Sequence, residues 1–390
     1  MCTAQSFPWP IEILMKTQAT STLDLVFTSA FRGRPIRRSL AAIFIAASLL
    51  AIPANADENS DGVAAARSGN FEQAQMHWER AAAENDPAAM RNLAGLYMSG
   101  VLGAPDLERA RGLFEKGAEL GDAGSQLSLG YIYLNGMGVT TDSARARMYF
   151  EAAAKAGDVE ARFMRSQMAF EDGAQGEDLQ RALNDLRAAA DANHPPALAR
   201  VADLLRTGTY TEQNIQDAIR YHEQAAKFGY VQSANTLGEI YLFAETGEVQ
   251  MAEAMQWFEK AASEGNVAAA YSLATVIYAN PVASDEELAR AFHHAEKAAH
   301  AWDESAQLLL GRMFLEGRAV PQHLMQAYLW FDLAASAGVH EAHHYRAIAA
   351  TRLGPEKSAE AHDLARSWFE ENHAKPHTHR SVERGQHTFE

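Results

Sequence analysis

The chain has 390 residues, of which 47% are hydrophobic, and it carries a formal net charge of −16 and one cysteine. The acidic balance argues against nucleic acid and against anionic lipid headgroups as ligands, because both are bound by clusters of Lys and Arg. It also suits a basic protein partner. The single cysteine, Cys2, cannot form an intramolecular disulfide, and a chain of this length can bury enough surface to fold without one.

The amino terminus carries the signals of protein export. Arg37 and Arg38 precede residues 40–52, which hold no charged side chain, and Ala54 and Ala56 form an A-x-A site directly afterwards. This order is typical of a secretory signal peptide, with cleavage expected after the second alanine. An uncleaved membrane anchor is the alternative, although the apolar run is short for a membrane span. We therefore expect a periplasmic or secreted protein.

Cleavage at this site would make the remaining chain more acidic. The leader holds five of the 34 basic and two of the 50 acidic side chains, which leaves a net charge of −19.

From about residue 80 to residue 340, one local pattern returns every 36 residues. It consists of an alanine followed, three residues later, by a residue that ends a helix. The alanines are Ala82, Ala118, Ala154, Ala190, Ala226, Ala262, Ala299 and Ala335, with a single step of 37 before Ala299. The helix-ending residues are Asn85, Gly121, Gly157, Asn193, Gly229, Gly265, Trp302 and Gly338. Self-similarity at this period indicates stacked supersecondary units.

The segment Leu107–Asp142 shows how one unit is built. Apolar residues around Phe114 recur at helical spacing, and Gly121 can close that helix in the left-handed conformation. Asp122 can then accept hydrogen bonds from the first N–H groups of a second helix. Gly130 on the second helix allows a close approach to a neighbouring helix. Each unit is therefore predicted to be an antiparallel helix pair with a short connection.

Aromatic residues in register are expected to fill the space between the units. They are Trp78, Phe114, Phe150, Phe258 and Phe331 on the first helices. The third and fourth units are the least regular, because Arg165 occupies a position that is leucine in other units. No single pair can bury both of its faces, so the pairs must stack. We predict an all-α fold, a right-handed α-solenoid with about eight units.

The chain is expected to divide into five parts. These are a leader and signal peptide (1–56), an N-terminal capping helix (57–70), eight repeats (71–353), a C-terminal capping helix (354–371) and a disordered tail (372–390).

The repeat resembles that of the Sel-1-like family, a branch of the tetratricopeptide-like solenoids. An aromatic pair, Lys-Ala-Ala and a glycine occur together in Trp257–Gly265. Leu-Gly, a tyrosine and Gly-x-Gly-Val followed by Asp occur in Leu129–Asp142. The resemblance implies an adaptor fold for protein–protein contacts, common in bacterial envelopes, and no fixed reaction. Secreted members that staple each helix pair with cysteines differ from this chain, so their described activities are not carried over.

Two groups of residues suggest metal chemistry. His340, Glu341 and His344 match H-E-x-x-H, the pattern of zinc proteases. The repeat itself supplies a Glu-Ala three residues after Gly338, as it does after Gly157, so a structural origin is the stronger interpretation. Histidines also gather in the tail, at positions 373, 377, 379 and 387, where incidental surface residues are the simpler explanation. We expect no cofactor, no metal site and no catalytic residue.

The positions before the core aromatics are the candidate binding surface. They are His77, Leu113, Tyr149, Asp185, Tyr221, Trp257, His294 and Trp330. In the family that this repeat resembles, the first helices line the concave face, so aromatics repeated there would form adhesive positions for a peptide or a partner helix. Packing between units is the competing explanation for each residue. Tyr221, Trp257 and Trp330 are expected to be partly exposed, with Tyr149 as a fourth candidate.

The sequence thus favours a non-enzymatic scaffold that binds an envelope protein or peptide. Such a protein would be a regulator or adaptor in envelope signalling, or in exopolysaccharide or cell-surface assembly. The alternatives are a protein that binds glycan or peptidoglycan fragments through the aromatic positions, and a metal-dependent hydrolase that uses His340, Glu341 and His344.

Overall fold

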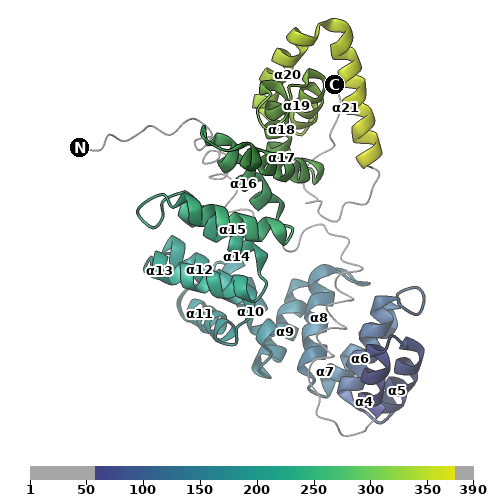
Figure 1. The fold of residues 1–390 in the computed structure, drawn as a ribbon. Helices are drawn as coiled ribbons and strands as arrows, with labels where there is room; N and C mark the ends of the chain where they lie inside the picture. The colour runs from purple at the N-terminus through teal and green to yellow at the C-terminus, as the bar shows by residue number, and fades with distance from the viewer. Residues whose placement is uncertain (1–57, 374–390) are drawn as a thin grey trace. The chain divides into compact units, whose positions relative to one another are not determined.

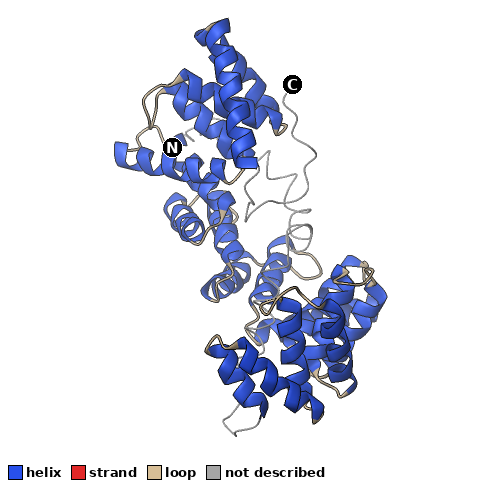
Figure 2. Cartoon of the chain, turned by 90° about the vertical axis from the view of Figure 1, so that its right-hand side faces the viewer, coloured by secondary structure: helices blue, strands red, loops and turns tan. Residues whose placement is uncertain are grey.

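The computed structural model describes residues 58–373, and across this range the chain forms α-helices joined by loops, with no strand (Figure 2). The helices are α4 (Glu58–Arg67), α5 (Phe71–Ala83), α6 (Pro87–Ser99), α7 (Leu107–Glu119), α8 (Ala123–Asn135), α9 (Ser143–Lys155), α10 (Val159–Glu171), α11 (Gly176–Asp191), α12 (Pro195–Thr207), α13 (Ile215–Lys227), α14 (Val231–Leu242), α15 (Met251–Ser263), α16 (Val267–Ala279), α17 (Asp285–His300), α18 (Glu304–Glu316), α19 (Leu324–Ser336), α20 (His340–Leu353) and α21 (Pro355–His373).

The helices from α5 to α20 follow one another as pairs of a first and a second helix (Figure 1). The second helices α6, α8, α10, α12, α16 and α18 each pack against the first helix of the next pair as well as against their own partner, and α14 packs against α15. This arrangement confirms the predicted all-α solenoid of stacked helix pairs. The contacts divide the chain into two compact units: among the described residues, α4 to α13 belong to one unit and α14 to α21 to the other.

The predicted helix-ending residues all adopt a left-handed backbone conformation. The positive φ angles are 63° at Asn85, 86° at Gly121, 94° at Gly157, 59° at Asn193, 83° at Gly229, 93° at Gly265, 69° at Trp302 and 95° at Gly338. Glycine and asparagine tolerate this region, whereas a bulky residue such as tryptophan rarely adopts it. The 36-residue repeat of stopping residues therefore sets where each first helix ends.

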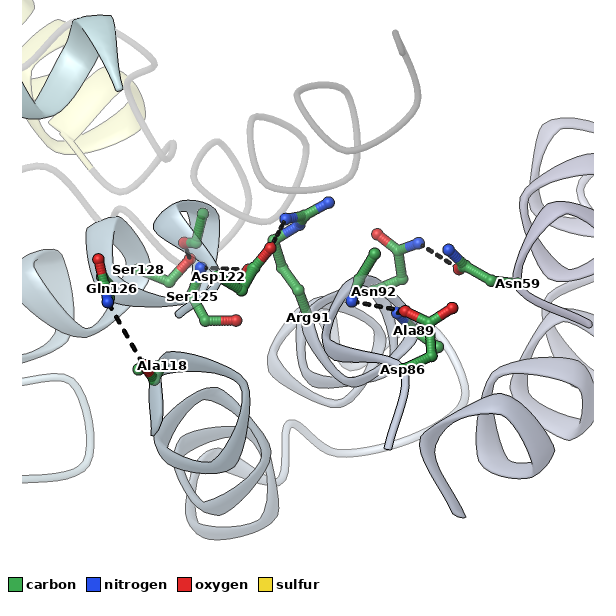
Figure 3. A network of polar contacts seen from close by, with 12 residues as sticks. Asn59, Asp86, Ala89, Arg91, Asn92, Ala118, Asp122, Ser125, Gln126 and Ser128 are labelled. Carbon is green, nitrogen blue, oxygen red and sulfur yellow. Dashed lines mark hydrogen bonds and ion pairs between the residues drawn. The ribbon is translucent and has the colours of Figure 1, made fainter. Parts of the chain in front are cut away.

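Aspartates at the start of second helices cap the helix, and Asp122 also joins two neighbouring repeats (Figure 3). Asp122 accepts a hydrogen bond from the backbone N–H of Ser125 (2.7 Å). Its other carboxylate oxygen accepts from Nη1 of Arg91 on α6 at 2.5 Å. Asp86 caps α6 through Ala89 N–H at 3.0 Å. One carboxylate can thus satisfy an otherwise unpaired helix N-terminus and hold the second helix of the preceding repeat.

The core between repeats is built from a glycine on one helix and an aromatic ring on the next. Phe150 on α9 and Phe258 on α15 are fully buried. A Cβ atom added at Gly130 on α8 would lie 2.5 Å from the Phe150 ring, and one added at Gly238 on α14 would lie 2.5 Å from Phe258. Gly311 and Phe331 repeat this arrangement, since a Cβ atom added at Gly311 would lie 2.6 Å from the Phe331 ring. The predicted close approach at Gly130 is therefore confirmed, with a ring as the opposing group.

The irregular region around α10 and α11 holds a charged pair that includes Arg165, at a position that is leucine in other repeats. Nε and Nη2 of Arg165 donate to the two carboxylate oxygens of Asp185 at 2.7 and 2.6 Å. Nη1 of Arg165 lies 3.2 Å from the Glu151 carboxylate. Asp185 is only 8% exposed, so the arginine predicted to break the pattern at position 165 is compensated by an aspartate on the next helix. The bidentate geometry satisfies both groups away from bulk water.

Helices α4 and α21 flank the eight pairs. The α4 residue Glu58 accepts from Nδ1 of His77 at 2.6 Å, and the backbone oxygen of Asn59 accepts from the indole N–H of Trp78 at 3.3 Å. At the other end, α21 packs chiefly against α19 and to a smaller extent against α20.

No helix among residues 58–373 is both long enough and apolar enough to cross a membrane. The predicted signal peptide with Ala54 and Ala56, the single cysteine and the histidines at 377, 379 and 387 lie outside the described residues.

Candidate protein-interaction surface

The candidate surface consists of the residues that directly precede the core position on each first helix, which we call the flank positions. The core residue points into the stack, as Phe114, Phe150 and Phe258 do at zero exposure. The flank residue lies one position earlier, so it projects about 100° away around the helix. Its exposure therefore depends on what lies beside the helix rather than on the core.

Tyr149 on α9 is half-buried and stacks on Tyr133 of α8, with ring centroids 5.7 Å apart and planes 7° apart. The guanidinium of Arg145 lies over the Tyr133 ring at 5.2 Å. Burial, helped by the nearby acidic residue Glu115, raises the pKa of Tyr149, so its hydroxyl remains a hydrogen-bond donor at neutral pH. This flank position presents one edge of an aromatic pair to solvent.

Tyr221 on α13 and Trp257 on α15 are also half-buried, as expected. The ammonium group of Lys260 lies 5.4 Å from the Trp257 ring centroid, one helical turn further along α15. A lysine over an indole is a cation–π contact that leaves part of the ring for other partners. The sequence prediction of partial exposure is correct for these two residues.

The prediction is wrong for Trp330, which is only 4% exposed. Trp368 of α21 lies across it, with ring centroids 5.1 Å apart at an interplanar angle of 66°. His300 at the end of α17 contacts both Trp330 (5.2 Å) and Trp368 (5.6 Å). Trp302, in the left-handed position after α17, contacts Trp368 at 5.3 Å. The expected exposure fails because α21 packs against α19 (Figure 1) and places Trp368 on this flank position.

The remaining flank positions have structural partners. Asp185 pairs with Arg165 and His77 with Glu58. Burial lowers the pKa of His294, whose Nε2 lies 3.5 Å from the Glu259 carboxylate. Leu113 packs against the hydrophobic core. Among the flank positions, partly exposed aromatic surface is therefore offered at Tyr149, Tyr221 and Trp257.

The residues of the H-E-x-x-H match lie in the first turns of α20, where His340 and His344 are exposed. The His344 ring contacts its neighbour Tyr345 at 5.7 Å. Nowhere in residues 58–373 do three His, Cys, Asp or Glu side chains come close enough together to hold a metal ion. The geometry thus offers these histidines no third ligand from the described part of the chain.

Sequence reasoning missed the role of Trp368 as the covering residue. A usable signal was present, because Trp302 stands where the other repeats have glycine or asparagine, and a tryptophan also lies in the closing helix. Two tryptophans that depart from the repeat near its end indicate a contact that the repeat itself does not supply.

Comparison with known structures supports the fold. The chain is similar to the crystal structure of c5321, a protective antigen of uropathogenic Escherichia coli strains that displays an SLR fold, at 24% identity over 84% of this chain and 73% of that chain, with a TM-score of 0.69. A Sel1 repeat protein from Oxalobacter formigenes matches at 24% identity over 63% of this chain and 97% of that chain, with a TM-score of 0.56. At these identities the likeness shows the fold alone. No curated protein matches the sequence.

The Sel1 repeat model matches residues 56–86, 87–122, 123–158, 195–230, 231–266, 267–301 and 304–339. The stretch between 158 and 195, which it leaves unmatched, contains the Arg165–Asp185 pair. The matched stretches cover well over half of the sequence, and they contain the glycines and aromatics that pack the repeats together. The chain therefore belongs to the Sel1 repeat family.

Proposed function

We propose that the protein is a non-enzymatic scaffold that binds a partner protein through the partly exposed flank positions of its first helices. One observation carries this proposal: the chain already binds a helix of its own in this way. Helix α21 lies along α19 and places Trp368 on the flank residue Trp330. A flank position with an aromatic side chain is thus suited to hold an amphipathic helix.

Trp257 is the best candidate for the same contact with another protein. It occupies on α15 the position that Trp330 occupies on α19, next to a fully buried phenylalanine in each case. Trp330 is covered by α21, whereas Trp257 is half-exposed. A partner helix that carries an aromatic or aliphatic side chain could bury the Trp257 ring, and buried aromatic anchors supply much of the binding free energy at interfaces.

The net charge of the chain further restricts the kind of partner helix that we expect. The chain is strongly acidic, at −16 overall and −19 without the predicted leader. Opposite charge accelerates association and disfavours like-charged competitors. We therefore expect the partner segment to be an amphipathic helix with a basic polar face.

The expected signal peptide would place this scaffold in the periplasm or outside the cell. There it would serve as a regulator or adaptor in envelope signalling, or in exopolysaccharide or cell-surface assembly. Glycan binding by the same aromatics and hydrolysis through His340, Glu341 and His344 are the competing functions that the experiment below separates.

The test is affinity capture from the native cell envelope with the mature chain, followed by identification of bound proteins. The binding variant replaces Tyr149, Tyr221 and Trp257 with alanine. The control is Val282→Ala, which removes apolar surface from a residue that is 85% exposed in the loop before α17. Trp330 is left intact because its replacement would disturb the packing of α21.

We expect a protein that is retained by the wild type and by the control but lost with the triple variant. Loss of one aromatic anchor typically weakens binding by about 2 kcal/mol or more, which is about 30-fold. Equal retention of every partner by the triple variant would refute the proposed surface. Binding of glycan fragments in the absence of any protein partner would favour the second function. Zinc-dependent hydrolysis that is lost in Glu341→Ala would favour the third.

A further inference from the structure

We infer that a pocket between α19, α20 and α21 binds a small organic anion, a carboxylate on a short apolar chain. The pocket has a volume of about 500 Å³ and is open to solvent, with His343, Ala347 and Ala359 exposed along it. Three alanines form its apolar wall. Its polar lining comprises Tyr328, His343, Arg346, Ser358 and His362.

The buried carboxylate of Asp332 holds two of the polar lining residues, Arg346 and His362, in place. Asp332 on α19 has zero exposure, and it accepts from Nη1 of Arg346 on α20 at 2.5 Å. It also contacts Nδ1 of His362 on α21 at 2.7 Å. One fully buried carboxylate thus fixes two side chains from two other helices, which removes much of the rotamer freedom that ligand binding would otherwise have to restrict.

Arg346 and Tyr328 supply hydrogen-bond donors to the lining. The guanidinium of Arg346 has five N–H donors, of which Nη1 is directed to Asp332, while Nη2 lies 3.5 Å from the His343 ring. Burial, together with the nearby Asp332 charge, raises the pKa of Tyr328, so its hydroxyl stays protonated at neutral pH. No acidic side chain lines the pocket itself. A group rich in acceptors and negatively charged is the chemical complement of this wall.

The Ser358 side chain in the pocket lining forms structural hydrogen bonds with the backbone. Its hydroxyl lies 2.7 Å from the Gly354 carbonyl oxygen and 3.1 Å from that of Ala350, and it donates to this pair of acceptors at the junction of α20 and α21. This contact shapes the pocket floor and does not compete for the anion.

The shape and the charge together select the ligand class. An aliphatic chain can lie on the alanine methyl groups, and its carboxylate can accept from Arg346 in the geometry that guanidinium groups favour. This inference is independent of the flank positions, because none of the three partly exposed aromatics lines the pocket.

The test is isothermal titration calorimetry of the mature chain with hexanoate, and with 1-hexanol as the uncharged probe of the same chain length. We expect saturable binding of hexanoate and at least tenfold weaker binding of the alcohol. Arg346→Gln should weaken hexanoate binding by about tenfold or more, because a charge-assisted hydrogen bond is lost. Since that variant also removes a buried ion pair, its circular dichroism spectrum is recorded alongside.

His343→Gln keeps the contacts of Asp332 intact and should weaken hexanoate binding by about two- to tenfold. His344→Gln is the matched control, since the neighbouring histidine is also exposed but does not line the pocket. It should bind as the wild type does. Absence of saturable hexanoate binding, equal binding of the alcohol, or wild-type affinity in folded Arg346→Gln would overturn the inference. Tighter binding of inorganic phosphate than of hexanoate would overturn the assignment to carboxylates.

Discussion

The contact between Gly130 and Phe150 allows a quantitative test of how the repeats pack. An added Cβ at Gly130 would lie 2.5, 2.6 and 2.9 Å from three atoms of the Phe150 ring, where carbon atoms normally approach to about 3.5–4.0 Å. The ring is fully buried and would have to move by about 1 Å in a closely packed core. Gly130→Ala should therefore incur an overpacking cost of about 1–3 kcal/mol.

The same substitution at Gly95 provides the matched control. Gly95 lies within α6 of the same compact unit, and an added Cβ there would meet no atom within 4 Å. Both substitutions gain about 1 kcal/mol of helix propensity, so this term cancels in the comparison. The difference between the two changes in unfolding free energy, measured by urea denaturation followed with far-UV circular dichroism, should be about 1–3 kcal/mol. Equal effects of the two substitutions would refute the packing argument.

A second variant tests whether the ring is the cause. Where the third repeat meets the fourth, Leu186 occupies the core position and Ser166 stands in place of the glycine. Phe150→Leu in the Gly130→Ala background should therefore relieve the clash, so that the double variant is more stable than the sum of the two single changes predicts. Additive effects would show that the ring is not the obstacle.

Two further predictions concern buried ionisable groups. Arg165→Leu should destabilise the protein by about 3–5 kcal/mol because it leaves the buried Asp185 carboxylate without its bidentate partner, whereas Arg165→Leu with Asp185→Leu should recover most of this loss in urea denaturation. Burial, with help from the Asp303 charge, raises the pKa of Tyr271 to about 12, above the usual value of about 10. Its folded form therefore holds the proton more tightly than the unfolded form, so its stabilising contribution is complete below about pH 10 and is lost as the pH rises toward 12. Tyr271→Phe should flatten this part of the stability profile, and an unchanged slope would contradict the assignment.

Much of the fold was predictable because the same local sequence pattern, with the same structural consequence, recurs many times along the chain. A helix-ending residue every 36 positions fixes the helix ends, and all eight of the named residues have positive φ angles. The aromatic series in register is buried in the structure, from Trp78 at 4% to Phe331 at zero exposure. A single glycine or phenylalanine would have been weak support, whereas recurrence at a fixed period makes each residue confirm the others.

Contacts that occur once in the molecule were not predictable in the same way. The partner of Arg165 lies 20 residues away on the next helix, and the sequence showed only that position 165 breaks the pattern. The pocket around Asp332 needs residues from three helices, and the repeat period relates none of them to one another. The pocket contacts depend on how α21 lies, and no periodic signal describes a helix that is not part of the repeat.

The flank positions show why a role cannot be transferred between repeats by register alone. The backbone directs each flank side chain in a similar way, yet Asp185 lies in a buried ion pair, Trp330 is sealed by α21, and Trp257 is half-exposed under a lysine. The difference arises from the neighbouring element rather than from the position itself. The repeat therefore creates equivalent flank positions along the chain. The side chains and helices that pack over each position determine whether it remains available to a partner. On this argument, removing the ring of Trp368 should make Trp330 resemble Trp257: in Trp368→Ala, we expect Trp330 fluorescence to become more accessible to iodide quenching, whereas unchanged accessibility would show that α21 does not control this surface.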